Sequence, residues 1–179
     1  MLKKILLGLV ALLAVILIVG AFQSNTYRVE RSITIAAPAA AVFSQINDVH
    51  QMQAWSPWAK LDPNAKMTFD GPASGVGAGF AWAGNSAVGE GRETIIASTP
   101  TELVRMKLEF FKPMAGVATT EFHLQSAGAG TSVTWSMSGD KNYVSKVMCL
   151  FMSMDKMIGG DFERGLANMK ALVGLAGKK

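Results

Sequence analysis

Reactive side chains are scarce in this sequence of 179 residues, which holds one cysteine, Cys149, and two histidines, His50 and His123. A single cysteine excludes an intramolecular disulfide and any metal site built from several cysteines. Because it lies between Met148 and Leu150, we expect it to be a small buried apolar side chain. Neither histidine has a Cys, Asp or Glu at metal-ligand spacing. We therefore predict no metal site and no cofactor.

Catalytic motifs are also lacking, since there is no Ser/His/Asp order, nucleophile elbow or HExxH helix. The glycines at 75, 77 and 79 do not form a dinucleotide fingerprint, because Phe80 stands where a glycine is needed and no helix follows. They predict a bend or bulge in a sheet instead. The pair Asp48 and His50, together with Glu90, are weak candidates for acid–base catalysis.

Charge is sparse, at 17% of residues, and the net charge of +4 comes from Lys3, Lys4, Lys178 and Lys179 at the two ends. Between these ends no cluster of Lys and Arg forms a basic stripe, which is the usual mark of a nucleic-acid surface. We therefore predict no nucleic-acid partner, and the sequence does not identify a protein partner.

The sequence has one long apolar run, the eighteen uncharged residues 5–22, ILLGLVALLAVILIVGAF. As a helix rising 1.5 Å per residue it would be about 27 Å long, enough to cross the hydrocarbon core of a bilayer. Residues 1–4 form a basic tail in which Lys3 and Lys4 favour a cytoplasmic N-terminus. This predicts a single-pass membrane anchor with the domain on the non-cytoplasmic side, facing the periplasm from a bacterial inner membrane.

Two other interpretations of this run stay open. A cleaved signal peptide has the same basic start, and Val19, Gly20 and Ala21 offer a cleavage pattern that would leave a secreted or periplasmic protein. Signal cores are usually about 7 to 15 residues long, so the longer run favours an uncleaved anchor. A buried helix of the domain is disfavoured because the run has no polar face.

Residues 27–175 are predicted to form one domain, most of which alternates with the period of a β-strand. In the first strand, 27–37, Arg31 shares a face with Val29 and Ile33, which is tolerable at a sheet edge where its stem can snorkel. Short helices are expected at 39–46 and 49–55, and further strands at about 66–70, 80–82, 87–98, 102–111, 117–125 and 131–138.

After residue 140 the apolar period becomes that of a helix. The stripe comprises Met154, Ile158, Phe162, Leu166, Met169 and Val173. Gly159 and Gly160 predict a kink, or a break from a shorter helix at 144–152. This amphipathic helix is the only large element able to cover the sheet. The sequence therefore predicts an α+β fold, with a curved antiparallel sheet wrapped around a long C-terminal helix behind an N-terminal transmembrane helix.

A sheet wrapped around one helix leaves a cavity wherever side chains do not fill the gap. The predicted cavity walls are Phe80, Trp82, Met106, Phe110, Phe122, Trp135, Met137, Met154, Ile158 and Phe162. Other methionines, which adapt to irregular space, are also expected inside: Met148, Met152, Met157 and Met169. An ordinary packed core is the alternative for all of them. The segment from Trp55 to Trp58 is interpreted as a ligand portal or, preferably, as a packed turn.

Short motifs with a common pattern are spread through the domain. They are RSITIAAP at 31–38, Val42-Phe43, Asn47-Asp48, WSPW at 55–58, Asp62-Pro63, GVGA at 75–78, WAGN at 82–85, Gly89-Glu90-Gly91 and DFExGL at 161–166. Together they resemble the START/Bet v 1-like superfamily, specifically bacterial polyketide cyclase/dehydrase-like (SRPBCC) proteins. The resemblance covers about residues 27–173 and implies a helix-grip fold with an apolar ligand cavity. None of the motifs is a catalytic signature.

These observations leave three functional hypotheses. The leading one is a membrane-tethered protein that binds a hydrophobic small molecule or lipid in an internal cavity, with no catalysis established. The second is a polyketide cyclase/dehydratase-like enzyme acting on an apolar aromatic precursor, with His50, Asp48 or Glu90 as acid or base. The third is an interaction module with a filled core. A cavity would count against the third, and a cavity-facing group with a strongly shifted pKa would favour the second.

Overall fold

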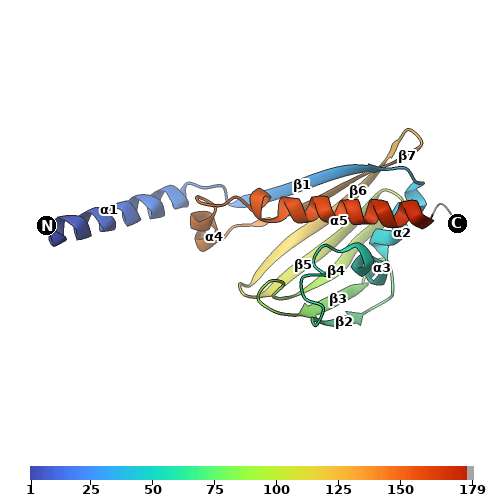
Figure 1. Cartoon of the computed structure of the whole chain (residues 1–179), viewed down its shortest axis with the longest axis horizontal. Helices are drawn as coiled ribbons and strands as arrows, with labels where there is room; N and C mark the ends of the chain where they lie inside the picture. Colours follow the sequence, from blue (N-terminus) through green and yellow to red (C-terminus); the bar gives the residue numbers. More distant parts are fainter. Residues whose placement is uncertain (177–179) are drawn as a thin grey trace.

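The computed structural model describes residues 1–176, so Lys178 and Lys179 lie outside the described residues. The chain begins with α1 (Leu2–Ala21), which projects from one end of the domain (Figure 1). Within the described part of the chain, α1 is the one helix long and apolar enough to cross a membrane, and almost none of it is buried. A signal sequence would have the same length and composition.

The domain itself is a single sheet, with two short helices after its first strand and two helices after its last. After α1 the elements are β1 (Thr26–Ile35), α2 (Ala39–Asn47), α3 (Val49–Trp55), β2 (Lys66–Asp70), β3 (Gly79–Ala83), β4 (Glu90–Thr99), β5 (Leu103–Lys112), β6 (Gly116–Ala127), β7 (Gly130–Asp140), α4 (Tyr143–Met148) and α5 (Met154–Ala176). The strand order is β1-β7-β6-β5-β4-β3-β2 and every pairing is antiparallel. Each strand from β2 to β6 therefore pairs with the next strand along the chain. The last strand, β7, also pairs with the first, β1.

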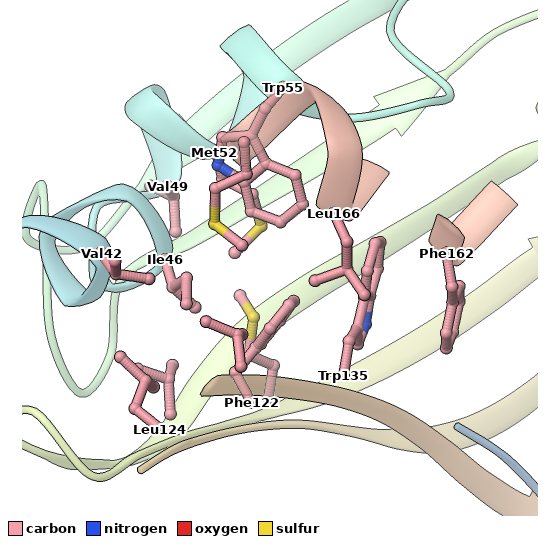
Figure 2. Close-up of a cluster of buried hydrophobic side chains, with 14 of the residues drawn as sticks. Val42, Ile46, Val49, Met52, Trp55, Phe122, Leu124, Trp135, Phe162 and Leu166 are labelled. Carbon is pink, nitrogen blue, oxygen red and sulfur yellow. The ribbon is translucent and has the colours of Figure 1, made fainter. Parts of the chain in front are cut away.

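Helix α5 lies along the sheet, as Figure 1 shows. Its inward stripe is buried at Phe162, Leu166, Met169 and Val173. Figure 2 shows side chains of α2, α3 and α5 converging with those of the sheet, including Phe122. The predicted helix-grip arrangement is confirmed, because the alternating strands and the helical stripe bury their apolar faces against each other.

The glycine pair in the last helix does not break it. Helix α5 runs without interruption through Gly159, and the break from α4 lies further upstream, at residues 149–153. Arg31 stays partly exposed at the edge strand, and its guanidinium reaches the surface of α5, 2.7 Å from Asp155 Oδ1 and 2.7 Å from Glu163 Oε1. Hydrogen bonds to Asp155 and then Glu163 raise the pKa of Arg31. The absence of a Cβ at Gly159 makes room for that guanidinium.

Replacing Gly159 with alanine tests this packing. Its new Cβ would overlap the guanidinium of Arg31, so the usual gain of about 1 kcal/mol from Gly→Ala in a helix should be reduced. In a chain that also carries Arg31→Ala, the full gain is expected. Gly160→Ala is the matched control, because its Cβ meets only the end of Arg164 at 3.8 Å. Denaturant unfolding measures the native chain, Arg31→Ala, Gly159→Ala in both backgrounds, and Gly160→Ala. Equal effects of Gly159→Ala in both backgrounds would contradict the packing.

Three methionines predicted to face the interior do not. Met148, Met152 and Met157 are 46%, 51% and 45% exposed, and Cys149 is only partly buried. The reason is topological: α4 and the segment after it pack beside the end of α1 rather than over the sheet. Met157 lies on the outer face of α5, off its buried stripe.

Candidate functional site

A cavity of about 470 Å³ lies between the sheet, α3, the segment after α3, and α5. Its size falls in the range of sites for drug-sized ligands, about 300–1,000 Å³. Most of its lining is aromatic or aliphatic. The lining residues are Met52, Gln53, Trp55, Ser56, Trp58, Ala59, Asp62, Pro63, Ala65, Met67, Phe69, Phe80, Trp82, Ala87, Val88, Glu93, Leu108, Phe110, Thr120, Phe122, Trp135, Met137, Ile158 and Phe162. Figure 2 shows part of this wall.

Trp135 on β7 organises the aromatic wall. Its ring stacks on Phe162 of α5 with centroids 4.1 Å apart and on Phe122 of β6 at 5.0 Å. Trp55 and Trp58 meet it edge-on, at 5.6 and 5.7 Å. Offset and edge-to-face pairs of this kind are worth about 0.5–1.5 kcal/mol beyond burial. The wall is therefore rigid and preformed on the side that faces α5.

The opposite side of the cavity is open. Its exposed lining residues come from β2, the segment before it and the β3–β4 connection, and they are Ala59, Pro63, Met67, Phe69 and Ala87. Asp62 holds this rim together, because its carboxylate accepts the backbone N–H of Asn64 at 3.1 Å and that of Asn85 at 2.7 Å. The mouth is thus framed by the edge strand rather than by α5.

One carboxyl group lies deep in this apolar cavity. Glu93 extends from β4, paired across the sheet with Phe80 and Leu108. The residue is half-buried and lines the cavity. Burial raises the pKa of Glu93 to about 7, and an interaction with the hydroxyl of Thr120 offsets this only in part. The carboxyl therefore changes its charge near neutral pH.

Eight of the ten residues predicted as cavity walls do line it. They are Phe80, Trp82, Phe110, Phe122, Trp135, Met137, Ile158 and Phe162. Met106 is fully buried in the core and Met154 is partly buried against it, and neither is a lining residue. Trp55 and Trp58 both belong to the wall, and Trp55 is 1% exposed, as a packed turn requires.

None of the three predicted acid–base candidates lines the cavity. Asp48 caps α3, accepting the backbone N–H groups of His50 and Gln51 at 2.8 and 3.1 Å. Burial raises the pKa of Asp48, but these hydrogen bonds outweigh burial and the pKa is lowered. His50 packs its ring edge-on against Phe69. Glu90 pairs with Lys112 at 2.8 Å. Residues 1–176 contain no group of three His, Cys, Asp or Glu side chains that could hold a metal ion.

Glu93 was not predicted as a site residue, although its strand carries a signal. Ile95 is buried, and a period of two from it places Glu93 and Gly91 on the same inward face. A β-bulge between Ile95 and Ala97 shifts the register there. If the alternation of inward and outward side chains is instead counted back from the end of β4 beyond the bulge, Glu93 is assigned to the outward face. The inward position of its carboxyl is then missed.

A curved antiparallel sheet that grips a long helix around an apolar cavity defines a helix-grip protein with a ligand-sized site. The sequence model of the family described as "Polyketide cyclase / dehydrase and lipid transport" matches residues 26–174, and the chain belongs to this family. This confirms the predicted resemblance. No curated protein matches the chain.

Solved structures share the fold at low sequence identity. Ara h 8.0201 has a TM-score of 0.60 and 14% identity, over 83% of this chain and 97% of its own. Protein CV1439 from Chromobacterium violaceum has a TM-score of 0.55 and 17% identity, over 83% and 96%. The di-domain ARO/CYC StfQ from the steffimycin biosynthetic pathway has a TM-score of 0.61 and 9% identity, over 87% of this chain and 53% of its own. At these identities the similarity is one of fold.

Proposed function

We propose that this protein binds a hydrophobic small molecule or lipid in the cavity and is held at a membrane by α1. The observation that carries the proposal is the cavity itself, a preformed apolar space of about 470 Å³ that the protein's own side chains leave unfilled. Protein interiors are normally close-packed. A cavity of this size with an aromatic wall is therefore best explained by a ligand that occupies it, and it counts against an interaction module with a filled core.

Filling the cavity is expected to abolish ligand binding. Leu108 lies on β5 and faces the cavity, so Leu108→Trp would place an indole in the ligand space. Lys107→Trp is the matched control, because this neighbouring residue is exposed on the other face of the strand. With the neutral fluorescent probe N-phenyl-1-naphthylamine, we expect at least about a tenfold loss of affinity for Leu108→Trp and no change for the control. Circular dichroism verifies that both variants fold. Equal binding by both would contradict the proposal.

Contacts between α1 and α4 support an uncleaved anchor. The hydroxyl of Tyr143 donates a hydrogen bond to the carbonyl oxygen of Leu17 at 2.7 Å. Gly20 lets the side chain of Val147 approach the helix closely. The exposed apolar side chains of α4 and the following segment include Met148 and Phe151, the latter 75% exposed. An apolar surface beside the end of an apolar helix is suited to the interface of a bilayer.

A charge in the middle of α1 is expected to release the protein from membranes. Arginine at a helix centre costs about 2.5–3.5 kcal/mol on insertion scales, so Leu12→Arg should move much of the chain into the alkaline carbonate supernatant. Gln23→Arg, just outside the helix, is the control and should stay in the pellet. The intact mass of the native chain should include residues 1–21. A mature chain that begins near Phe22 would contradict the anchor and support a signal peptide.

A cyclase or dehydratase is the second candidate, and Glu93 is the observation that favours it. A cavity-facing carboxyl with a pKa of about 7 suits a general acid or base at neutral pH. The test is conversion of a poly-β-ketone aromatic precursor, followed by absorbance. Under this hypothesis Glu93→Gln retains binding and loses turnover. A native chain that binds the precursor without converting it would contradict the enzyme hypothesis and leave ligand carriage as the remaining function.

A further inference from the structure

Glu93 is the one ionisable group of the inner cavity among the described residues, and its carboxyl has hydrogen-bonding capacity to spare, as has the unpaired indole N–H of Trp135. Among the lining residues within 1–176, only Glu93 and Asp62 are ionisable, and neither is a cation. The Asp62 carboxylate at the rim already accepts two backbone N–H groups. The Glu93 carboxyl has no ion-pair partner among the described residues, and its polar neighbour is the buried hydroxyl of Thr120.

This arrangement restricts the charge of the ligand. A carboxylate or phosphate inside the cavity would lose its hydration and meet a carboxyl group without a compensating cation. A purely apolar ligand would leave the Glu93 carboxyl with the Thr120 hydroxyl as its one polar neighbour and its remaining hydrogen-bonding capacity unused, which is itself unfavourable. A neutral ligand with one polar group near Glu93 avoids both costs.

Building on the proposed function, we propose that Glu93 hydrogen-bonds the polar group, a carbonyl or hydroxyl oxygen, of an otherwise apolar and uncharged ligand, and that the cavity rejects anionic amphiphiles. Below about pH 7 the carboxyl is protonated and donates its O–H to the ligand oxygen. Above that pH the carboxylate can only accept, so it cannot bind a ketone oxygen. Among the lining residues from β3, β5, β6, β7 and α5, the polar groups are the Thr120 hydroxyl, the unpaired indole N–H of Trp135 and the indole N–H of Trp82, which donates to the carbonyl oxygen of Val88. Gln53 and Ser56 line the cavity as uncharged residues, and among the described lining residues Asp62 is the one other group that titrates.

Four matched naphthalene probes test the proposal on the full chain in lipid nanodiscs. They are 2-acetylnaphthalene, its hydrocarbon isostere 2-isopropenylnaphthalene, 2-naphthoate and the cation of 2-(aminomethyl)naphthalene. Calorimetric titrations are run at about pH 6 and pH 8, and the heat measured with empty nanodiscs and with Leu108→Trp is subtracted. We expect the ketone to bind about tenfold more tightly than the hydrocarbon at pH 6. This advantage should be lost at pH 8, and naphthoate should not bind at either pH.

Variants at two positions of β4 connect the effect to Glu93. Glu93→Leu should remove the preference for the ketone while the hydrocarbon still binds. Glu93→Gln should keep the preference and lose its pH dependence, because an amide N–H donates at both pH values. Glu90→Gln lies on the same strand outside the cavity and should behave like the native chain.

The outcomes separate this inference from the proposed function. Equal affinities for ketone and hydrocarbon, unchanged by Glu93→Leu, would overturn the inference and leave ligand binding intact. Tight binding of naphthoate would also overturn it. If the ammonium probe has the highest affinity of the four, and its affinity increases from pH 6 to pH 8, Glu93 forms an ion pair with a cationic ligand. That result would overturn the inferred hydrogen bond to an uncharged ligand. Binding of none of the probes to the native chain would overturn the proposed function itself.

Discussion

Replacing Trp135 with alanine is expected to lower the free energy of unfolding by about 3–5 kcal/mol, the range for large aromatic residues in cores. Trp135 is 4% exposed and stacks between Phe162 and Phe122, with Trp55 and Trp58 against its edges. Its removal would enlarge an existing cavity and separate α5 from the sheet. The neighbouring rings already border the cavity, so we do not expect them to move in and fill the space that the indole leaves. Denaturant unfolding of the full chain measures the loss.

Two further substitutions show whether ring packing is the cause. Trp135→Phe keeps a stacked ring and removes an indole N–H that has no hydrogen-bond partner within the described residues. It should therefore cost much less than alanine. Phe111→Ala removes an aromatic ring that is 53% exposed, and it should change stability by no more than about 0.5 kcal/mol. A loss below about 1 kcal/mol for Trp135→Ala would contradict the role of Trp135 in the wall.

The second large effect is a loss of stability as the pH rises. Folding raises the pKa of Glu93 from 4.5 to about 7 through burial. The folded state therefore binds more protons than the unfolded state between these values, so stability is complete below about pH 4.5 and decreases up to about pH 7. At 1.36 kcal/mol per pKa unit, the loss contributed by Glu93 is about 3 kcal/mol.

Comparison with Glu93→Gln isolates this contribution. The glutamine chain cannot ionise at this position, so its free energy of unfolding should lack the decrease between about pH 5 and pH 8. Asp48, Glu121 and Asp155 have lowered pKa values and affect stability only at more acidic pH, and they act equally in both chains. Parallel pH profiles for the two chains would show that the Glu93 carboxyl is not buried as described.

Periodicity was sufficient to predict the architecture. Alternation in β5 places Val104 and Met106 inside, and the helical stripe of α5 buries Phe162 and Leu166. These two periods fix which faces meet, so the sheet and its covering helix follow from local pattern. Arg31 interrupts the alternation of β1, and the sequence gives no indication that Asp155 and Glu163, more than a hundred residues later, complete its environment.

The cavity was predicted less completely than the fold. Alternation shows which side chains of a strand face inward, but not which of them border the cavity and which pack in the core. Met106 shares its face with Leu108 and pairs with Ile95 and Thr120, yet its side chain is fully buried and does not line the cavity. Leu108, one step further along this face, borders the cavity. Glu93 was missed because a charged residue on a strand is ordinarily interpreted as exposed. The bulge between Ile95 and Ala97 shifts the alternation, so counting from the far end of β4 places Glu93 on the outer face, and only the paired sheet reveals that bulge.

The most direct test of the cavity's function is the analysis of what the protein carries from the cell. The native full chain, Leu108→Trp and Lys107→Trp would be purified in parallel, extracted with organic solvent and compared by mass spectrometry. Membrane lipids that accompany α1 will be common to all three. We predict one uncharged apolar molecule or class of molecules in the native and Lys107→Trp samples that is depleted at least about tenfold in Leu108→Trp. Identical extracts from all three chains would contradict ligand binding in the cavity.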